Sequence, residues 1–223
     1  MLKTLVLLTG AVEQKHLIPL FQRFNRSLIV QSVETLAQLT SISPDRLASA
    51  RLVAFSSGVI VPPDVLRALG HGAFNFHPAS PDYPGSAGIS FAIYERARRF
   101  GATFHGMVEQ VDAGPILDVE MFDVPPGVTA VGLAEESYSA LARLLWRHAE
   151  ALATGRDFTP LPDVGWAQRK TTHRLFASFC DIPADMDQKE LSRRIDAFGV
   201  GDGRSVPTVT LHGYKFRLVR DGE

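Results

Sequence analysis

The chain has 223 residues, enough for one domain of ordinary size or for one domain with a small appendage. Its composition, 45% hydrophobic and 21% charged, is typical of soluble globular proteins and argues against a disordered, fibrous or membrane-embedded chain. The 23 Lys and Arg residues nearly balance the 24 Asp and Glu residues, so no charge-driven affinity for nucleic acid or anionic lipid is expected. The single cysteine, Cys180, excludes an intramolecular disulfide and a cysteine zinc cluster and favours a cytoplasmic location.

The amino-terminal part alternates the patterns of buried strands and amphipathic helices. Its first apolar run is too short for a signal peptide or a membrane span and predicts a buried strand. The predicted elements are a strand at 4–8, a helix over 17–24, strands at 27–30 and 52–55, a helix that begins at Pro62 and ends near Gly70, and a strand at 73–76.

The pattern continues beyond this strand. Ser86 is a candidate cap for a helix through Phe100, with Gly101 as its terminating residue. Two strands are predicted at 102–110 and 116–124, joined by the loop 111–115. Thr129 then caps the clearest helix, which ends at Gly155 and carries an apolar stripe that includes Tyr138; core packing is favoured over a dimer face for this helix, Trp146 included.

After Pro162 the pattern changes to a small helix and a hairpin. Asp187 and Glu190 form a capping-box pattern before a helix stopped by Gly199, and residues 206–211 and 214–219 flank a tight turn. The whole pattern predicts an α/β fold, a Rossmann-like and mostly parallel sheet flanked by helices, with a small C-terminal helix-plus-hairpin appendage. We expect a catalytic domain over residues 1–158 and a small subdomain over 159–223.

Two polar side chains stand where the predicted strand at 73–76 runs into a turn rich in proline and glycine. Residues two apart on a strand share a face, so Asn75 and His77 can converge on one point. Parallel sheets bind ligands beyond the carboxyl ends of their strands. On residue type alone, a hydrogen-bonded structural histidine is the favoured interpretation of His77. The common nucleotide, zinc-protease and serine-hydrolase motifs are absent from the sequence.

The segment Asn75-x-His77-Pro78, followed about 35 residues later by Val111-Asp112-Ala113-Gly114-Pro115, resembles the signature of the folate-dependent formyltransferases. The resemblance covers about Leu52 to Thr154. It implies that Asn75, His77 and Asp112 are catalytic and that two loops hold the pterin ring of 10-formyltetrahydrofolate. The residues implied in binding this co-substrate are Phe55, Ser56, Ser57, Gly58, Val59, Ile60, Val108, Val111 and Asp112.

The chemistry implied by the resemblance is attack of an amine on the formyl carbon. Asn75 and a protonated His77 would donate hydrogen bonds to the oxyanion of the tetrahedral intermediate. Asp112 would hold the imidazole, favour its charged form and help to move a proton from the attacking amine to the folate nitrogen. No metal is required by this scheme.

Departures from the family pattern concern the acceptor. The loop 79–85 is one residue shorter than usual and has Pro84 where arginine is common, and Thr9-Gly10-Ala11-Val12 lacks the phosphate cradle of glycinamide ribonucleotide formyltransferases. The short segment after Pro162 and the near-neutral charge argue against tRNA. We therefore expect a small-molecule amine acceptor, most simply a nucleotide-linked amino sugar, no nucleic-acid or membrane partner, and a homodimer as one possible assembly.

Three alternatives remain open from the sequence. A hydrolase of 10-formyltetrahydrofolate would use the same three residues, with water in place of the amine. A folate-binding protein without activity would keep the same residues but a closed acceptor pocket. Trp166 and the run 168–170 either line the acceptor site or form a solvated linker, and the linker is the default interpretation.

Overall fold

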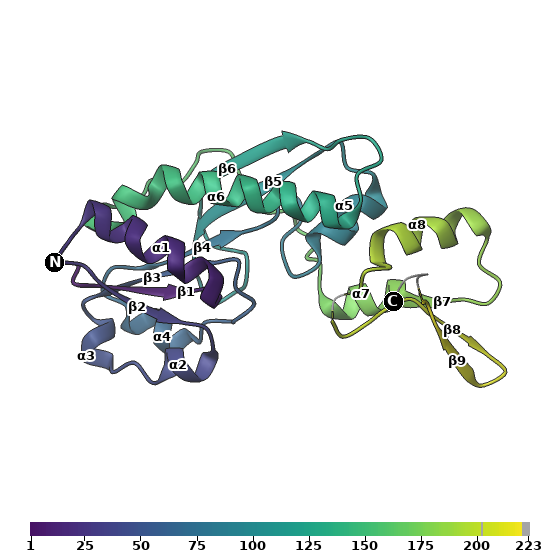
Figure 1. The fold of residues 1–223 in the computed structure, drawn as a ribbon, viewed down its shortest axis with the longest axis horizontal. Coiled ribbons are helices and arrows are strands. Elements are labelled where there is room, and N and C mark those ends of the chain that lie inside the picture. Colours follow the sequence, from purple (N-terminus) through teal and green to yellow (C-terminus); the bar gives the residue numbers. More distant parts are fainter. Residues whose placement is uncertain (202, 220–223) are drawn as a thin grey trace.

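The computed structural model describes residues 1–201 and 203–219 of the chain. Strands and helices alternate through the first two thirds of this part (Figure 1). The elements are β1 (Thr4–Leu8), α1 (Ala11–Phe24), β2 (Ile29–Val33), α2 (Leu36–Thr40), α3 (Pro44–Leu47), β3 (Ala50–Phe55), α4 (Pro63–Ala68), β4 (Ala73–His77), α5 (Gly88–Glu95), β5 (Arg99–Gly106), β6 (Ile116–Asp123), α6 (Ala130–Thr154), α7 (His173–Cys180), β7 (Asp181–Ile182), α8 (Gln188–Phe198), β8 (Thr208–Leu211) and β9 (Tyr214–Arg217).

Within the described residues, six strands form one sheet in the order β2-β1-β3-β4-β5-β6. The strands β2, β1, β3 and β4 are parallel, whereas β5 and β6 run antiparallel to their neighbours. The predicted α/β fold with a mostly parallel sheet is confirmed. The second strand lies two to three residues further along the chain than expected, because Ile29–Val33 is the segment that pairs with β1.

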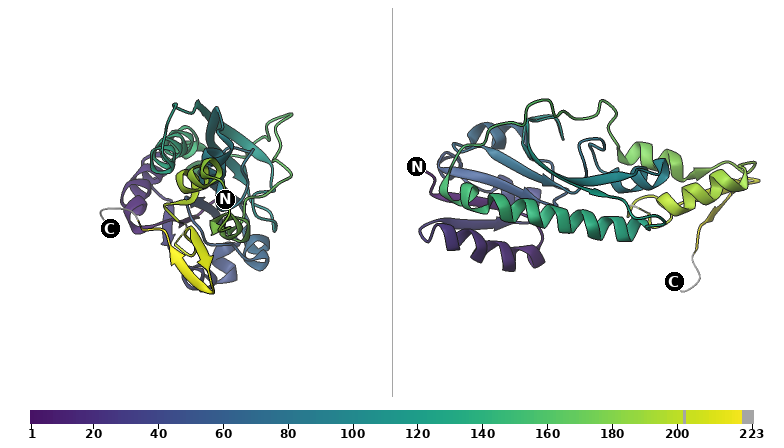
Figure 2. Two further views of the ribbon diagram at one scale, coloured as in Figure 1. Left: turned by 90° about the vertical axis from the view of Figure 1, so that its right-hand side faces the viewer. Right: turned by 90° about the horizontal axis from the view of Figure 1, so that it is seen from above.

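Two apolar layers cover the central strands, which explains why β1 and β3 are buried throughout. One layer packs α1 and α6 on the sheet around Phe21, Phe76 and Leu144. The other packs α2, α3 and α4 around Leu39, Leu52 and Val65. Figure 2 shows α6 running along the length of the sheet to the C-terminal segment. Continuous apolar sequences in β1 and β3 are therefore required by burial on both faces.

The long helix α6 has the predicted ends. The Thr129 hydroxyl accepts a hydrogen bond from the Gly132 N–H, and Gly155 ends the helix with φ of 78°. The buried Arg51 donates to the carbonyl oxygens at the end of this helix. Core packing was the wrong prediction for Tyr138 and Trp146, which are 40% and 63% exposed, because both lie outside the buried stripe of the helix.

The helix predicted over 86–100 is shorter than expected. α5 ends at Glu95, because Arg96 adopts a left-handed conformation with φ of 55°. Residues 99 and 100 instead pair with Asp123 and Phe122 as the start of β5. Gly101 is thus a strand residue, where a Cβ would lie 2.3 Å from the Glu120 carbonyl oxygen.

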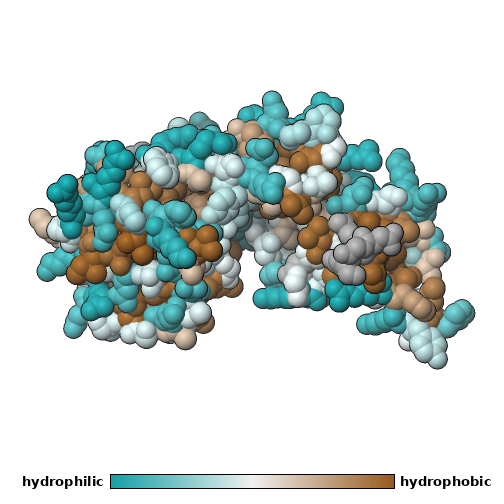
Figure 3. Space-filling view, in the orientation of Figure 1, coloured by the Kyte–Doolittle hydropathy of each residue, from teal (hydrophilic) through white to brown (hydrophobic). Residues whose placement is uncertain are grey.

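The C-terminal segment contains the predicted helix and hairpin and two elements that were not predicted, α7 and β7. Asp187 caps α8 as expected, with its carboxylate accepting from the Lys189 and Glu190 N–H groups. In the described residues β7, β8 and β9 form a second sheet, and the hairpin projects from the body of the molecule (Figures 1 and 3). Phe198 of α8 packs on Phe91 of α5, which fixes α8 against the first domain. The division at residue 158 stays a prediction.

No helix in residues 1–201 and 203–219 is long and apolar enough to cross a membrane.

Candidate active site

The end of β4 supplies the first two polar side chains of the site. β4 lies between β3 and β5 in the sheet, and Asn75 is paired with His105 of β5. The Asn75 amide Nδ2 donates to His105 Nε2 at 3.0 Å. Since an amide nitrogen carries two N–H groups, one donor of Asn75 is left for a ligand.

Asp112 lies in the loop between β5 and β6 and is buried. Its Oδ2 accepts a 2.8 Å hydrogen bond from the Gly85 N–H and lies 3.7 Å from His77 Nδ1, while its Oδ1 lies 3.4 Å from His105 Nε2. Its φ of 44° is a strained left-handed conformation for a residue with a side chain. The loop therefore holds one carboxylate against both imidazoles, and the three predicted catalytic residues lie in one cluster that also contains His105.

His105 is the member of this cluster that the sequence interpretation missed. It is buried in β5, where its Nδ1 donates to the Gly106 carbonyl oxygen at 2.9 Å, and its Nε2 lies 3.0 Å from Asn75 Nδ2 and 3.4 Å from Asp112 Oδ1. The sequence did contain a signal for His105, because a histidine inside an otherwise apolar strand is a polar group that needs a buried partner.

Burial has the largest effect on His77. It lowers the pKa of the imidazole below its ordinary value, against the opposite pull of Asp112, and the nearby His105 lowers it further. The ring nitrogens nevertheless face two acceptors, because Nδ1 lies toward Asp112 and Nε2 lies 3.4 Å from the Tyr83 carbonyl oxygen. Because burial lowers its pKa, His77 is favoured in the neutral form in the free chain, whereas the resemblance implied a protonated one.

Asp112 is shifted toward the ionised form. Burial alone would raise its pKa, but the neighbouring His105 and His77 imidazoles, together with the Gly85 N–H, lower the pKa below the ordinary value. The site therefore keeps a buried carboxylate charged at neutral pH.

A cavity of about 390 Å³, here called the loop cavity, opens on one side of His77. Its walls come from residues 57–61 and 107–112, from both histidines of the cluster, and from 170–173. Seven of the predicted folate-binding residues line it, namely Ser57, Gly58, Val59, Ile60, Val108, Val111 and Asp112. Phe55 and Ser56 do not line it: Phe55 is buried against Phe76 and Tyr138, and Ser56 turns the chain with φ of 49°.

A second cavity of about 410 Å³, here called the helix cavity, opens on the other side. It is bounded by the loop after His77 and by the starts of α5, α6 and α7. His77, Gly85, Ser86 and His173 line both cavities. The imidazole therefore stands at the boundary between two separate binding spaces.

The segment 166–172 completes the site, although a solvated linker was the default expectation. The Trp166 indole donates to the Gly114 carbonyl oxygen at 2.8 Å, and its ring contacts the two imidazoles of the cluster edge-on. The Thr171 N–H donates to the Pro84 carbonyl oxygen at 2.7 Å. A Cβ on Gly85 would lie 1.8 Å from the Thr171 carbonyl oxygen, so this close approach requires glycine. Gln168, Arg169 and Lys170 are exposed, as expected.

Comparison with known proteins identifies the family. A family model described as formyl transferase matches residues 25–145, more than half of the chain. The chain belongs to the formyl transferase family. In sequence, this family member is 31% identical over 144 residues to a methionyl-tRNA formyltransferase of Bacillus thuringiensis, and the match covers 64% of the chain and 43% of that protein. The chain thus matches less than half the length of this relative.

Solved structures share the fold over nearly the whole chain. A sugar N-formyltransferase from a Shewanella species has a TM-score of 0.80 at 16% identity, covering 98% of this chain and 96% of that one. An N-formyltransferase from Helicobacter canadensis, solved with folinic acid and dTDP-3-aminofucose, has a TM-score of 0.67 at 14% identity, covering 96% of this chain and 85% of that one. The predicted family and fold are confirmed.

Proposed function

We propose that this formyl transferase moves a formyl group from 10-formyltetrahydrofolate to the amine of a small acceptor, most simply a nucleotide-linked amino sugar. One observation carries the proposal. Asn75, His77, His105 and Asp112 form a single buried or half-buried cluster, and His77 separates two cavities that can hold a donor and an acceptor. A transfer between two bound molecules requires this arrangement, because both must reach the same polar groups.

The loop cavity suits the folate. Ile60, Val108 and Val111 leave large apolar surfaces exposed around it, at 66%, 44% and 44%. Exposed apolar side chains that line one cavity favour a flat, largely apolar ligand such as a pterin ring. The structural neighbour from Helicobacter canadensis was solved with folinic acid, a formylated folate, which supports the same donor here.

The cluster has the groups that acyl transfer to an amine needs. The donor supplies an activated formyl group, and the amine nitrogen forms a bond to its carbon before the bond to the folate nitrogen breaks. The free N–H of Asn75 and an N–H of His77 stabilise the oxyanion that develops on the formyl oxygen. The Asp112 carboxylate stabilises the positive charge on the attacking nitrogen and accepts its proton for return to the leaving nitrogen.

The neutral state of His77 in the free chain is compatible with this scheme. A neutral imidazole donates one N–H, and the developing oxyanion adds a negative charge beside the ring that raises its proton affinity. The proton released by the attacking amine is shared between Asp112 and the imidazole, whose Nδ1 lies 3.7 Å away, before it passes to the leaving folate nitrogen. While this proton is on the ring, a charged donor faces the oxyanion, where it has its largest effect on the rate.

A screen of amines with 10-formyltetrahydrofolate, followed by release of tetrahydrofolate, tests the proposal. We expect a nucleotide-linked amino sugar to support steady turnover and the matching formamide to appear as product. Formate release without any amine would contradict the transferase and indicate the hydrolase. Folate binding without turnover on any amine or water would indicate a binding protein.

A further inference from the structure

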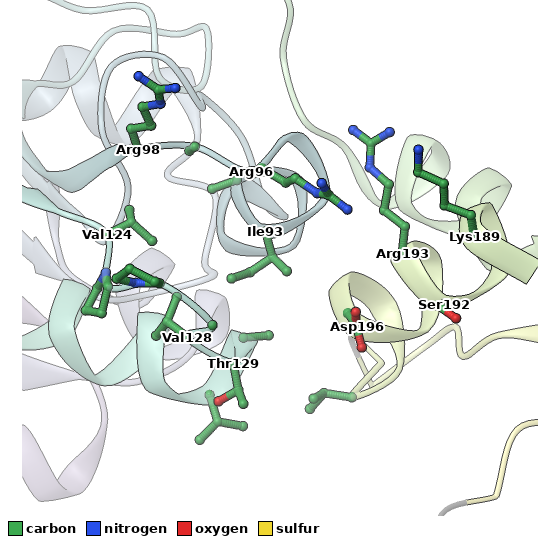
Figure 4. A pocket seen from close by; sticks show the side chains of 18 of the residues that line it. Ile93, Arg96, Arg98, Val124, Val128, Thr129, Lys189, Ser192, Arg193 and Asp196 are labelled. Carbon is green, nitrogen blue, oxygen red and sulfur yellow. The ribbon is translucent and has the colours of Figure 1, made fainter.

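A third and much larger cavity lies next to the helix cavity, and neither the cluster at His77 nor the proposed donor uses it. This cavity, here called the basic cleft, has a volume of about 1470 Å³ and lies between the end of α5, the loop before α6, and α8 (Figure 4). Four cationic side chains line it, from Arg96, Arg98, Lys189 and Arg193. Figure 4 shows Arg96 extending from α5 toward α8, which carries Arg193 and Lys189.

Four cationic side chains but two carboxylates, those of Asp187 and Asp196, line the basic cleft. No ion pair to Arg96, Arg98 or Lys189 occurs among residues 1–201 and 203–219. The cleft therefore has an excess of cationic groups, which favours an anionic ligand.

Arg193 is held in place before any ligand binds. Its Nε donates to the Tyr94 carbonyl oxygen at 2.6 Å, and its guanidinium carbon lies 3.9 Å from the centre of the Tyr94 ring. These contacts leave the terminal nitrogens as donors. A fixed guanidinium suits the paired oxygens of a phosphate group, because less side-chain entropy is lost on binding.

Arg96 is placed at the cleft at the expense of backbone strain. It ends α5 in the left-handed conformation, with φ of 55°, where glycine or asparagine is the less strained choice. The cost of this conformation for a residue with a side chain is about 1 kcal/mol. A strained arginine that makes no ion pair in the described part of the chain is a candidate for a role in binding.

The basic cleft is continuous with the helix cavity. Ala130, Val131 and Val200 line both spaces, and His77 lines the helix cavity but not the basic cleft. A molecule that extends through both would place one end at His77 and the other among the cations. Apolar side chains from Ile93 and Val128 line the same cleft and can cover the faces of a base or a sugar.

We propose that the basic cleft binds the diphosphate and nucleoside of a nucleotide-linked acceptor, while the helix cavity holds its amino sugar beside His77. The inference rests on the proposed function for the position of the amine. The anion subsite is a separate claim, which a binding measurement tests without any formyl transfer. The proposed ligand of the basic cleft is a nucleoside diphosphate, bound through its phosphates.

The test is titration of the full chain with UDP, dTDP, GDP and CDP, with uridine as the uncharged probe. We expect at least one diphosphate to bind saturably and its affinity to fall as salt rises, because Arg96, Arg98 and Lys189 are exposed. In the double variant Arg96→Gly with Lys189→Gln, the affinity for that diphosphate is expected to fall tenfold or more. The thermal midpoint should stay the same or rise, because glycine relieves the strain at position 96.

Arg99→Ala is the matched control, since Arg99 is an exposed neighbour of Arg98 that pairs with Asp123 and does not line the cleft. It should leave the affinity unchanged. The inference is overturned if none of the four diphosphates binds, or if the double variant and the control bind equally well. If the wild type formylates no amine but the double variant loses diphosphate binding, the anion subsite stands and the proposed function is refuted. If the double variant formylates the acceptor with an unchanged acceptor KM, the proposed function stands and the anion subsite is refuted.

Discussion

The two sides of His77 are built in different ways. The loop cavity is formed mainly by two short contiguous segments, 57–61 and 107–112, and its walls are apolar side chains and backbone. The helix cavity and the basic cleft draw instead on the starts of α6 and α7, on α5, and on α8 near the end of the chain. One side is thus local in sequence and tied to the catalytic motif, whereas the other is assembled by packing of distant segments. In the proposed function, the donor side is the one that is local in sequence, and the acceptor side is the one assembled from distant segments.

The largest effect is expected from Asp112, which lines the loop cavity and lies beside His77 at the boundary between the two cavities. Replacing it with Asn should lower kcat about 10³-fold, because the neutral amide can neither accept the proton nor stabilise a charged His77. The fold should persist, since Asn tolerates the left-handed conformation and its oxygen can still accept from the Gly85 N–H. Steady-state kinetics with 10-formyltetrahydrofolate and a saturating amine, with a melting curve as the folding control, measure this. Turnover within a fewfold of the wild type would refute the role of Asp112.

Asn75 should have the next largest effect. Asn75→Ala removes an oxyanion donor and is expected to lower kcat about 10²-fold, equivalent to roughly 3 kcal/mol of transition-state stabilisation. The KM for the donor should change little, because Asn75 is not part of the loop cavity walls. A raised donor KM with an unchanged kcat would instead place Asn75 in ground-state binding.

A pair of apolar variants should separate the two sides. Ile60→Ser, in the loop cavity, is expected to raise the KM for the donor about tenfold, since it removes apolar area that the ligand would cover. Val131→Ser, at the junction of the helix cavity and the basic cleft, should raise the KM for the acceptor and leave that of the donor unchanged. If either variant altered both KM values equally, the separation of donor and acceptor sides would be wrong.

The same difference explains what the sequence could predict. The convergence of Asn75 and His77 was predictable because a strand end and a turn fix their positions locally, and Asp112 was placed with them by the family resemblance. Glycines nearby meet backbone at close range. Gly114, for example, would place a Cβ 1.9 Å from the Gly106 carbonyl oxygen. His105 was missed because its role depends on the register that pairs β5 with β4, which no local pattern shows.

The acceptor side was less predictable for a related reason. The end of α5 was placed five residues too late because a left-handed arginine resembles a helix residue in sequence. The segment 166–172 contains exposed charged residues and was expected to be a linker, yet its backbone pairs with the loop at Pro84. Such backbone contacts depend little on side-chain type, so their sequence signal is weak.

The smallest expected effect concerns pH and stability, and it tests whether His77 is neutral in the free chain. Burial lowers the pKa of His77 in the folded chain, so below about pH 6.5 the unfolded chain binds a proton more readily and the folded chain loses stability. Asp112 acts in a lower pH range, because its lowered pKa contributes stability above about pH 4 that is lost on further acidification.

Because it removes the imidazole with the lowered pKa, His77→Gln should reduce the fall in thermal midpoint between pH 7.5 and pH 5.5. His16→Gln, an exposed substitution on α1, is the control and should follow the wild type. If His77→Gln and the wild type lose the same stability over this range, folding does not lower the pKa of His77. If the variant loses more stability than the wild type, the imidazole is protonated in the free chain, and the oxyanion would meet a preformed charge at His77.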